Sequence, residues 1–66
     1  MPLTKAEKLL LNGLKLFGLG RGNALLVMML MDTEQKRWNL MEYMVANQYA
    51  KEDEIIDITY QIHNKD

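Results

Sequence analysis

The sequence predicts an all-α fold, a compact bundle of three to four short helices that forms a single domain over residues 1–66. Three observations lead to this prediction: apolar residues recur at helical spacing, helix-capping residues stand where those segments begin, and glycine-rich or polar stretches separate them. The chain is 48% hydrophobic and 26% charged. A chain this short buries only about 60% of the surface that its unfolded form exposes, so we expect one small domain and no more.

The first helix is predicted over residues 4–17. Thr4 and Glu7 fit a capping box, in which the hydroxyl and the carboxylate accept hydrogen bonds from free backbone amides. Leu11 lies on the polar side of this helix, unlike the other leucines. Wound at 100° per residue, the apolar residues gather in one arc of about 160°. They are Leu3, Ala6, Leu9, Leu10, Gly13, Leu14, Leu16 and Phe17, and they lie opposite Lys5, Lys8, Asn12 and Lys15.

The stretch from Gly18 to Asn23 is rich in glycine and is interpreted as a linker between helices. Gly18 suits a left-handed C-cap, and Asn23 suits the N-cap of the next helix. Backbone amides of a glycine-rich stretch before a helix can also bind phosphate. Here no strand precedes the stretch, and the lysine and hydroxyl residues that end a phosphate-binding loop are missing. We therefore expect no phosphate site.

The second helix is predicted over residues 23–31 and the third over 33–47. Residues 24–31 are apolar on every side and too few to span a bilayer, so they are expected to form a central buried element. Asp32 and Thr33 are typical N-cap residues, so we expect the helix to break here and a new helix to begin in a different direction. The apolar arc of the third helix holds Trp38, Leu40, Met41, Met44 and Val45, whereas Lys36, Asn39, Glu42, Tyr43 and Asn47 form its polar side.

The last helix is predicted over residues 52–62. Glu52, Asp53 and Glu54 put negative charge in a first turn, where the helix dipole favours it. The isoleucines of residues 55–62 also alternate with polar residues, which is typical of a half-buried strand. A lone strand would have no partner in this chain, so a helix is preferred and the strand remains the alternative.

The composition argues against an enzyme. The chain has no cysteine and no serine, and so no thiolate zinc site, disulfide or serine nucleophile. His63 is the single histidine and lies near the C-terminus. Chain ends are usually poorly ordered, whereas a catalytic base must be held in a fixed position. The acids of residues 52–57 lack the glycine of a calcium loop. We predict no catalytic residues, no cofactor and no metal. With no membrane span and no signal peptide in the sequence, we expect a soluble, cytoplasmic protein.

The charge layout keeps a nucleic-acid function open as an alternative. The net charge is −1, with basic residues concentrated in residues 1–23 and acidic ones in residues 51–66. Residues 38–62 could form a helix-turn-helix-like pair, but its second helix would begin with acids that phosphates repel. Contacts with nucleic-acid phosphates would then have to come from other basic residues, namely Lys5, Lys8, Lys15 and Arg21. A membrane-surface role for the helix at residues 4–17 is ranked last, since its leucines are needed for the core.

The preferred hypothesis is a small module that acts by protein–protein contact. The apolar content exceeds what so small a volume can cover, which favours a homo-oligomer, most simply a symmetric dimer, or a small regulator or inhibitor that docks on a larger protein. Five of the six methionines lie in residues 28–44, and methionines build adaptable contact surfaces as well as cores. The residues predicted to make the contacts are Leu11, Arg21, Met28, Met29, Tyr43 and Tyr60.

Overall fold

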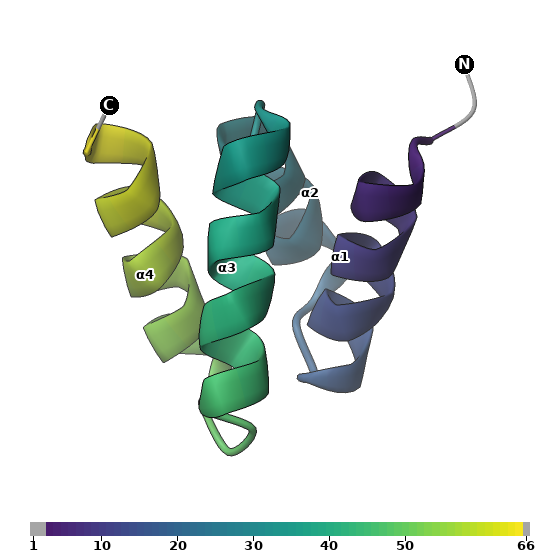
Figure 1. The fold of residues 1–66 in the computed structure, drawn as a ribbon. Helices are drawn as coiled ribbons and strands as arrows, with labels where there is room; N and C mark the ends of the chain where they lie inside the picture. Colours follow the sequence, from purple (N-terminus) through teal and green to yellow (C-terminus); the bar gives the residue numbers. More distant parts are fainter. Residues whose placement is uncertain (1–2, 66) are drawn as a thin grey trace.

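Four helices account for most of residues 3–65, which are the residues described by the computed structural model (Figure 1). They are α1 (Lys5–Leu16), α2 (Arg21–Leu30), α3 (Glu34–Ala46) and α4 (Glu52–Asn64). The predicted all-α bundle is confirmed, and so are the break after residue 31 and the restart near residue 33. The last segment is a helix, so the strand alternative for residues 55–62 is wrong.

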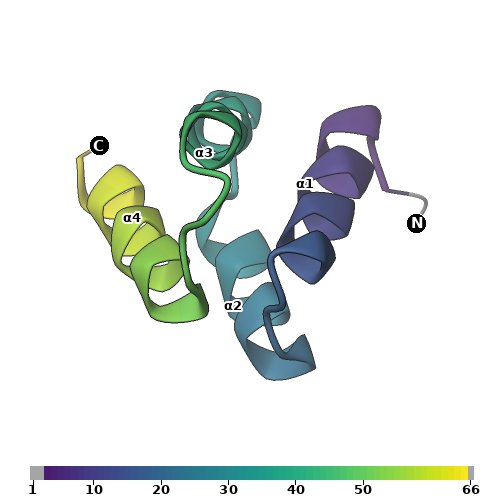
Figure 2. The ribbon, with the colours of Figure 1, turned by 90° about the horizontal axis from the view of Figure 1, so that it is seen from below.

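The helices are arranged in a ring whose order differs from the order in the chain. α1 packs against α2 and α3, and α4 packs against α3 and α2, so that α1 and α4 do not touch (Figure 2). The connections are short, so successive helices run in opposite directions, and α1 and α3 therefore run in the same direction side by side (Figure 1). The radius of gyration is 10.6 Å, close to the roughly 11 Å expected of a compact chain of this length.

Several helix ends form as the local sequence predicts. The Thr4 hydroxyl accepts a hydrogen bond from the Glu7 amide at 3.2 Å, and the Glu7 carboxylate accepts one from the Thr4 amide at 3.0 Å. This capping box starts α1. Thr33 caps α3 in the same way through the Lys36 amide. Gly18 ends the first helical segment with φ at +84°, a left-handed conformation that favours glycine.

The start of α2 differs from the prediction. Asn23 lies inside the helix, and the N-cap residue is Gly20, which has no side chain to cap with. The missing acceptor comes from α4: Glu52 accepts hydrogen bonds of 2.8 Å from the Gly20 amide and from the Asn23 side chain. The prediction of Asn23 as N-cap is wrong because the acceptor lies far along the sequence and only the fold brings it to this helix end.

The core lies at the centre of the ring and takes residues from all four helices. Its fully buried side chains include Leu10, Leu14, Val27, Met31, Leu40 and Ile55. The prediction that residues 24–31 form a central buried element is wrong. α2 contacts only α1 and α4, so its outer side stays in solvent, with Leu25 56% and Met29 76% exposed.

α3 is rotated relative to the orientation that its apolar arc predicts. Its buried residues are Lys36, Leu40 and Met44, and Lys36 reaches Asp32 with an Nζ–Oδ1 distance of 3.1 Å. A lysine can bury its aliphatic stem in this way while its ammonium group stays paired near the surface. Because α3 packs against α1 on one side and α4 on the other, half of its apolar arc is left uncovered. Trp38 and Val45 belong to that half.

Candidate functional site

An apolar groove of about 860 Å³ runs between the parallel helices α1 and α3. From α1 and its C-cap it is lined by Leu9, Gly13, Leu16 and Phe17. From α3 and the residues after it the lining is Trp38, Met41, Glu42, Met44, Val45, Ala46 and Gln48. We call this feature the α1–α3 groove.

The floor of the groove depends on a close approach between Gly13 and Met44. A Cβ atom at Gly13 would lie 3.1 Å from the Met44 Cε, which is tighter than ordinary van der Waals contact. The absence of a side chain at position 13 therefore lets Met44 reach the backbone of α1, and Met44 is only 4% exposed. Met41 lies beside it, half-buried against the core. The groove thus has a floor of methionine and glycine, which is soft and adaptable.

The two walls expose large apolar side chains. Leu16 is 87% exposed and Leu9 is 45% exposed on α1, while Val45 is 71% exposed and Trp38 is 46% exposed on α3. A single exposed leucine or valine is ordinary in a soluble protein. Four that flank one groove form a continuous apolar surface, and such surfaces mark contact sites.

The rims of the groove carry opposite charges near the start of each helix. Lys5 lies one helical turn before Leu9 on the same side of α1, and Glu34 lies one turn before Trp38 on the same side of α3. Lys5 and Glu34 are both exposed, as is Glu42, which lines the groove from α3. The exposed side chains therefore make the α1 rim basic and the α3 rim acidic. Arg37, also on α3, is partly buried; hydrogen bonds from Thr4 lower the pKa of Glu7 on α1, and Arg37 lies close enough to Glu7 to lower it further.

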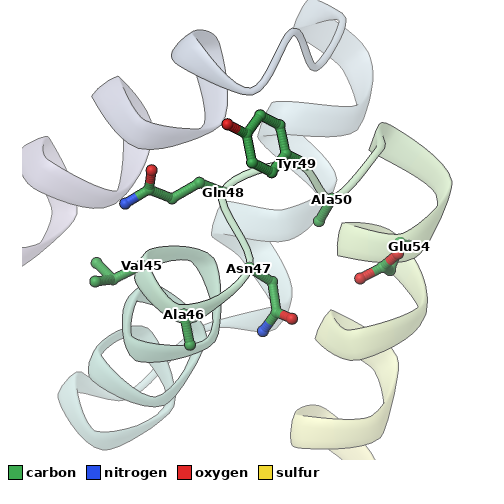
Figure 3. Close-up of a pocket in the computed structure, with 7 residues that line it drawn as sticks. All are labelled: Val45, Ala46, Asn47, Gln48, Tyr49, Ala50 and Glu54. Atoms are coloured by element: carbon green, nitrogen blue, oxygen red, sulfur yellow. The ribbon is translucent and has the colours of Figure 1, made fainter.

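A second hollow, of about 550 Å³, surrounds the connection between α3 and α4 (Figure 3). It shares Val45, Ala46 and Gln48 with the α1–α3 groove, so it continues that groove beyond the end of α3. Tyr49 and Glu54 also line it, with Tyr49 on the connection and Glu54 on α4 (Figure 3). Tyr49 is 98% exposed.

Several polar groups of the structure join helices to one another. The Tyr43 hydroxyl donates a hydrogen bond to the Glu54 carboxylate, and this bond together with partial burial raises the pKa of Tyr43 above its usual value. His63 places its Nδ1 3.3 Å from the carbonyl oxygen of Leu30. Among residues 3–65, no group of three histidine, aspartate or glutamate residues is arranged to hold a metal ion. Chemically, the groove is an apolar surface with charged side chains along its rims.

The six residues predicted to make contacts are spread over all four helices, and none of them lines the α1–α3 groove. Leu11, Met28 and Tyr43 are half-buried against the core, so Leu11 and Tyr43 do not stand free on polar faces as predicted. Both are partly covered because each helix packs against two others. Arg21, Met29 and Tyr60 are exposed on α2 and α4.

The groove could have been found from the width of the apolar arcs. Leu9 and Leu16 belong to the predicted arc of the first helix, and Trp38 and Val45 to that of the third. An arc of about 160° is wider than the stripe that one or two packed neighbours cover. Periodicity assigned the whole arc to the core, and the residues predicted to make contacts lie elsewhere on the helices, so the groove was not predicted.

Comparison with known proteins adds no family assignment: no protein-family model, curated protein or solved structure matches the chain. Within residues 3–65, none of the helices combines the length and the apolar character needed to cross a membrane.

Proposed function

We propose that this chain is a non-catalytic protein–protein interaction module that binds through the α1–α3 groove. It acts either as a homo-oligomer or as a small regulator or inhibitor that docks on a larger protein. The observation that carries the proposal is the exposure of Leu16 and Val45, 87% and 71%, on the two sides of one apolar groove.

The shape and lining of the groove suit an apolar protein surface. A groove between two helices receives the apolar side of a further helix, whose anchors recur at positions i, i+3 or i+4 and i+7. Met41 and Met44 can adjust their side chains to such anchors. The favourable free energy of binding would come from removing apolar surface from water, at about 25 cal/mol for each Å² buried.

The size of the chain makes such a contact a large part of its surface. The total accessible surface is 4732 Å². A standard interface buries about 800 Å² on each partner, which would be about a sixth of that total. One docking event of this size would therefore cover a substantial share of the surface of the chain.

A protein partner is preferred over nucleic acid because of the charges at the start of α4. Asp53 and Glu54 are exposed in its first turn, and the Glu52 carboxylate is bound to Gly20 and Asn23. A recognition helix would place this end against phosphates, which repel carboxylates. The groove itself is lined by apolar side chains and by one acid, Glu42.

The proposal is tested by photo-crosslinking in cells that produce the chain. A photoreactive residue is placed at Leu16 in one variant and at Asp57 of α4 in a control, since both side chains are exposed, neither belongs to the core and Asp57 lines neither hollow. We expect a specific protein adduct from position 16, either a second copy of the chain or another protein, identified by mass spectrometry. An adduct pattern at position 16 that is no stronger than at position 57 would contradict the proposal.

A further inference from the structure

The proposed function leaves the occupant of the groove open, and the charges of its rims identify one. Resting on that function, we infer that the occupant is a second copy of this chain, related by a two-fold axis that runs parallel to the groove. In this dimer α1 of each copy lies against α3 of the other.

The first argument is that the two walls carry matching patterns of opposite charge. On α1 the exposed residues of one side are Lys5, Leu9 and Leu16, and on α3 they are Glu34, Trp38 and Val45. Both series have the spacing i, i+4, i+11, which keeps them on one side of a helix. At these three positions each wall therefore offers a charge followed by two apolar anchors, and the sign of the charge is opposite on the two walls.

The second argument is that α1 and α3 are parallel and begin at the same end of the bundle (Figure 1). Rotation about an axis parallel to the groove leaves the height of every residue along the groove unchanged. Lys5 of one copy then lies at nearly the same height as Glu34 of the partner subunit. Leu16 likewise comes level with Val45 of the partner subunit, so apolar anchors meet apolar anchors.

The other way to place two grooves face to face leaves these charges without partners of opposite sign. A two-fold axis across the groove would set α1 against α1 and α3 against α3, each pair antiparallel. The start of one helix would then lie against the end of the same helix in the other copy, so Lys5 would come level with Leu16 of the partner subunit and Glu34 with Val45 of the partner subunit. A charged group placed against apolar side chains loses hydration without gaining an ion pair. The axis parallel to the groove is therefore the arrangement that this chain favours.

The inference is tested by reversing one rim at a time. Lys5→Glu puts an acid near the start of both rims, and Glu34→Lys puts a lysine near the start of both, and neither residue belongs to the core. The association of the full chain is measured by sedimentation velocity over a range of concentrations at low ionic strength, where exposed charges are least screened. We expect a dimer for the natural chain and a dimer weakened about tenfold or more in each variant, since each reversal turns two attractions into repulsions.

Mixing the two variants gives the decisive measurement. At positions 5 and 34 one variant carries two acids and the other carries two lysines, so the two copies complement each other, and an equimolar mixture is expected to form heterodimers with the affinity of the natural chain. Lys65→Glu and Asp57→Lys, which make the same charge changes at exposed positions of α4 and its C-cap, are the matched controls and are expected to leave the dimer intact.

The outcomes separate this inference from the proposed function. A natural chain that is monomeric at every concentration overturns the second copy as occupant, while a crosslink from position 16 to a different protein still supports the interaction module. A dimer that responds to Lys5→Glu and Glu34→Lys no more than to the controls overturns the parallel two-fold arrangement. Restored heterodimers in the mixture support it.

Discussion

The carboxylate of Glu52 accepts a hydrogen bond of 2.8 Å from the backbone N–H of Gly20, the N-cap residue of α2. The same oxygen accepts a second bond of 2.8 Å from the Asn23 side chain. One residue at the start of α4 thus caps the start of α2 and ties two helices that are adjacent in space. The Asn23 side chain and the Gly20 amide together hold the pKa of Glu52 below its usual value.

We predict that Glu52→Gln lowers the free energy of unfolding. Glutamine keeps an acceptor oxygen but removes the charge that favours the free amides at the start of α2. Asp53→Asn is the matched control, because it removes one charge from the same turn of α4 without touching α2. Urea titration followed by circular dichroism measures both variants. A loss in Glu52→Gln no larger than in Asp53→Asn would show that the link between the helices contributes nothing.

The lowered pKa values of carboxyl groups predict acid sensitivity. Hydrogen bonds from Thr4 lower the pKa of Glu7, and Asn23 and Gly20 lower that of Glu52, both from a usual value of 4.5. A carboxyl group whose pKa is lower in the folded state stabilises the fold fully above its unfolded pKa. That contribution is lost as the pH falls through the folded pKa. The free energy of unfolding should therefore decrease below about pH 4.5.

A pH series of urea titrations checks this expectation. In Glu52→Gln the decrease below about pH 4.5 should be shallower than in the natural chain, because one of the responsible groups is gone. A parallel pair of curves would mean that Glu52 has the same pKa in the folded and unfolded states.

Leu10 and Leu16 should respond to truncation in opposite ways, although both belong to the apolar arc of α1. Leu10 is fully buried and Leu16 is 87% exposed. Leu10→Ala is expected to cost about 2–5 kcal/mol in the free energy of unfolding. Leu16→Ala should change it by less than about 0.5 kcal/mol at concentrations where the chain is monomeric, while weakening association. Thermal unfolding at several concentrations separates the two effects. A large loss in the monomeric Leu16→Ala chain would contradict the exposure of this wall.

Gly13 is predicted to tolerate alanine but not a larger side chain. Alanine gains helix stability of about 0.5–1 kcal/mol over glycine, but its Cβ would lie 3.1 Å from the end of the flexible Met44 side chain. The two effects oppose each other, so Gly13→Ala should change stability by less than about 1 kcal/mol. Gly13→Ile should cost about 1–3 kcal/mol, because it pushes α1 and α3 apart.

The control for this series is Gly22→Ala in the first turn of α2, where nothing lies within 4 Å of the added Cβ. It should stabilise the chain by about 0.4–1 kcal/mol. Equal gains at positions 13 and 22 would show that Met44 moves aside at no cost.

Lys36 is expected to act through its aliphatic stem more than through its charge. Its side chain is buried, but its partner Asp32 is 59% exposed, and a pair with one partner in solvent contributes little. Lys36→Met keeps the stem and should change the free energy of unfolding by less than about 1 kcal/mol. Lys36→Ala loses the packing and should cost clearly more. Equal losses in the two variants would assign the role of Lys36 to the ion pair instead.

The sequence by itself determined the features that depend on neighbouring residues. Thr4 with Glu7 and Thr33 mark helix starts because a capping hydrogen bond joins residues three positions apart. Gly18 marks a helix end because a positive φ favours glycine. The last segment was predicted as a helix because a lone strand would have had no partner in this chain. The all-α class and the positions of the four helices follow from such local rules.

Only the tertiary structure decided which side of each helix faces the core. The apolar arcs of α1 and α3 are wider than the surface their neighbours cover, so periodicity alone could not tell that Leu10 is buried and Leu16 exposed. Nor could it show that α3 buries Lys36 and leaves Val45 in solvent, because that rotation is set by packing against α1 and α4 together. The Glu52 cap of α2 is likewise a contact between distant residues. The groove exists because two apolar arcs meet side by side and each is covered on one side only.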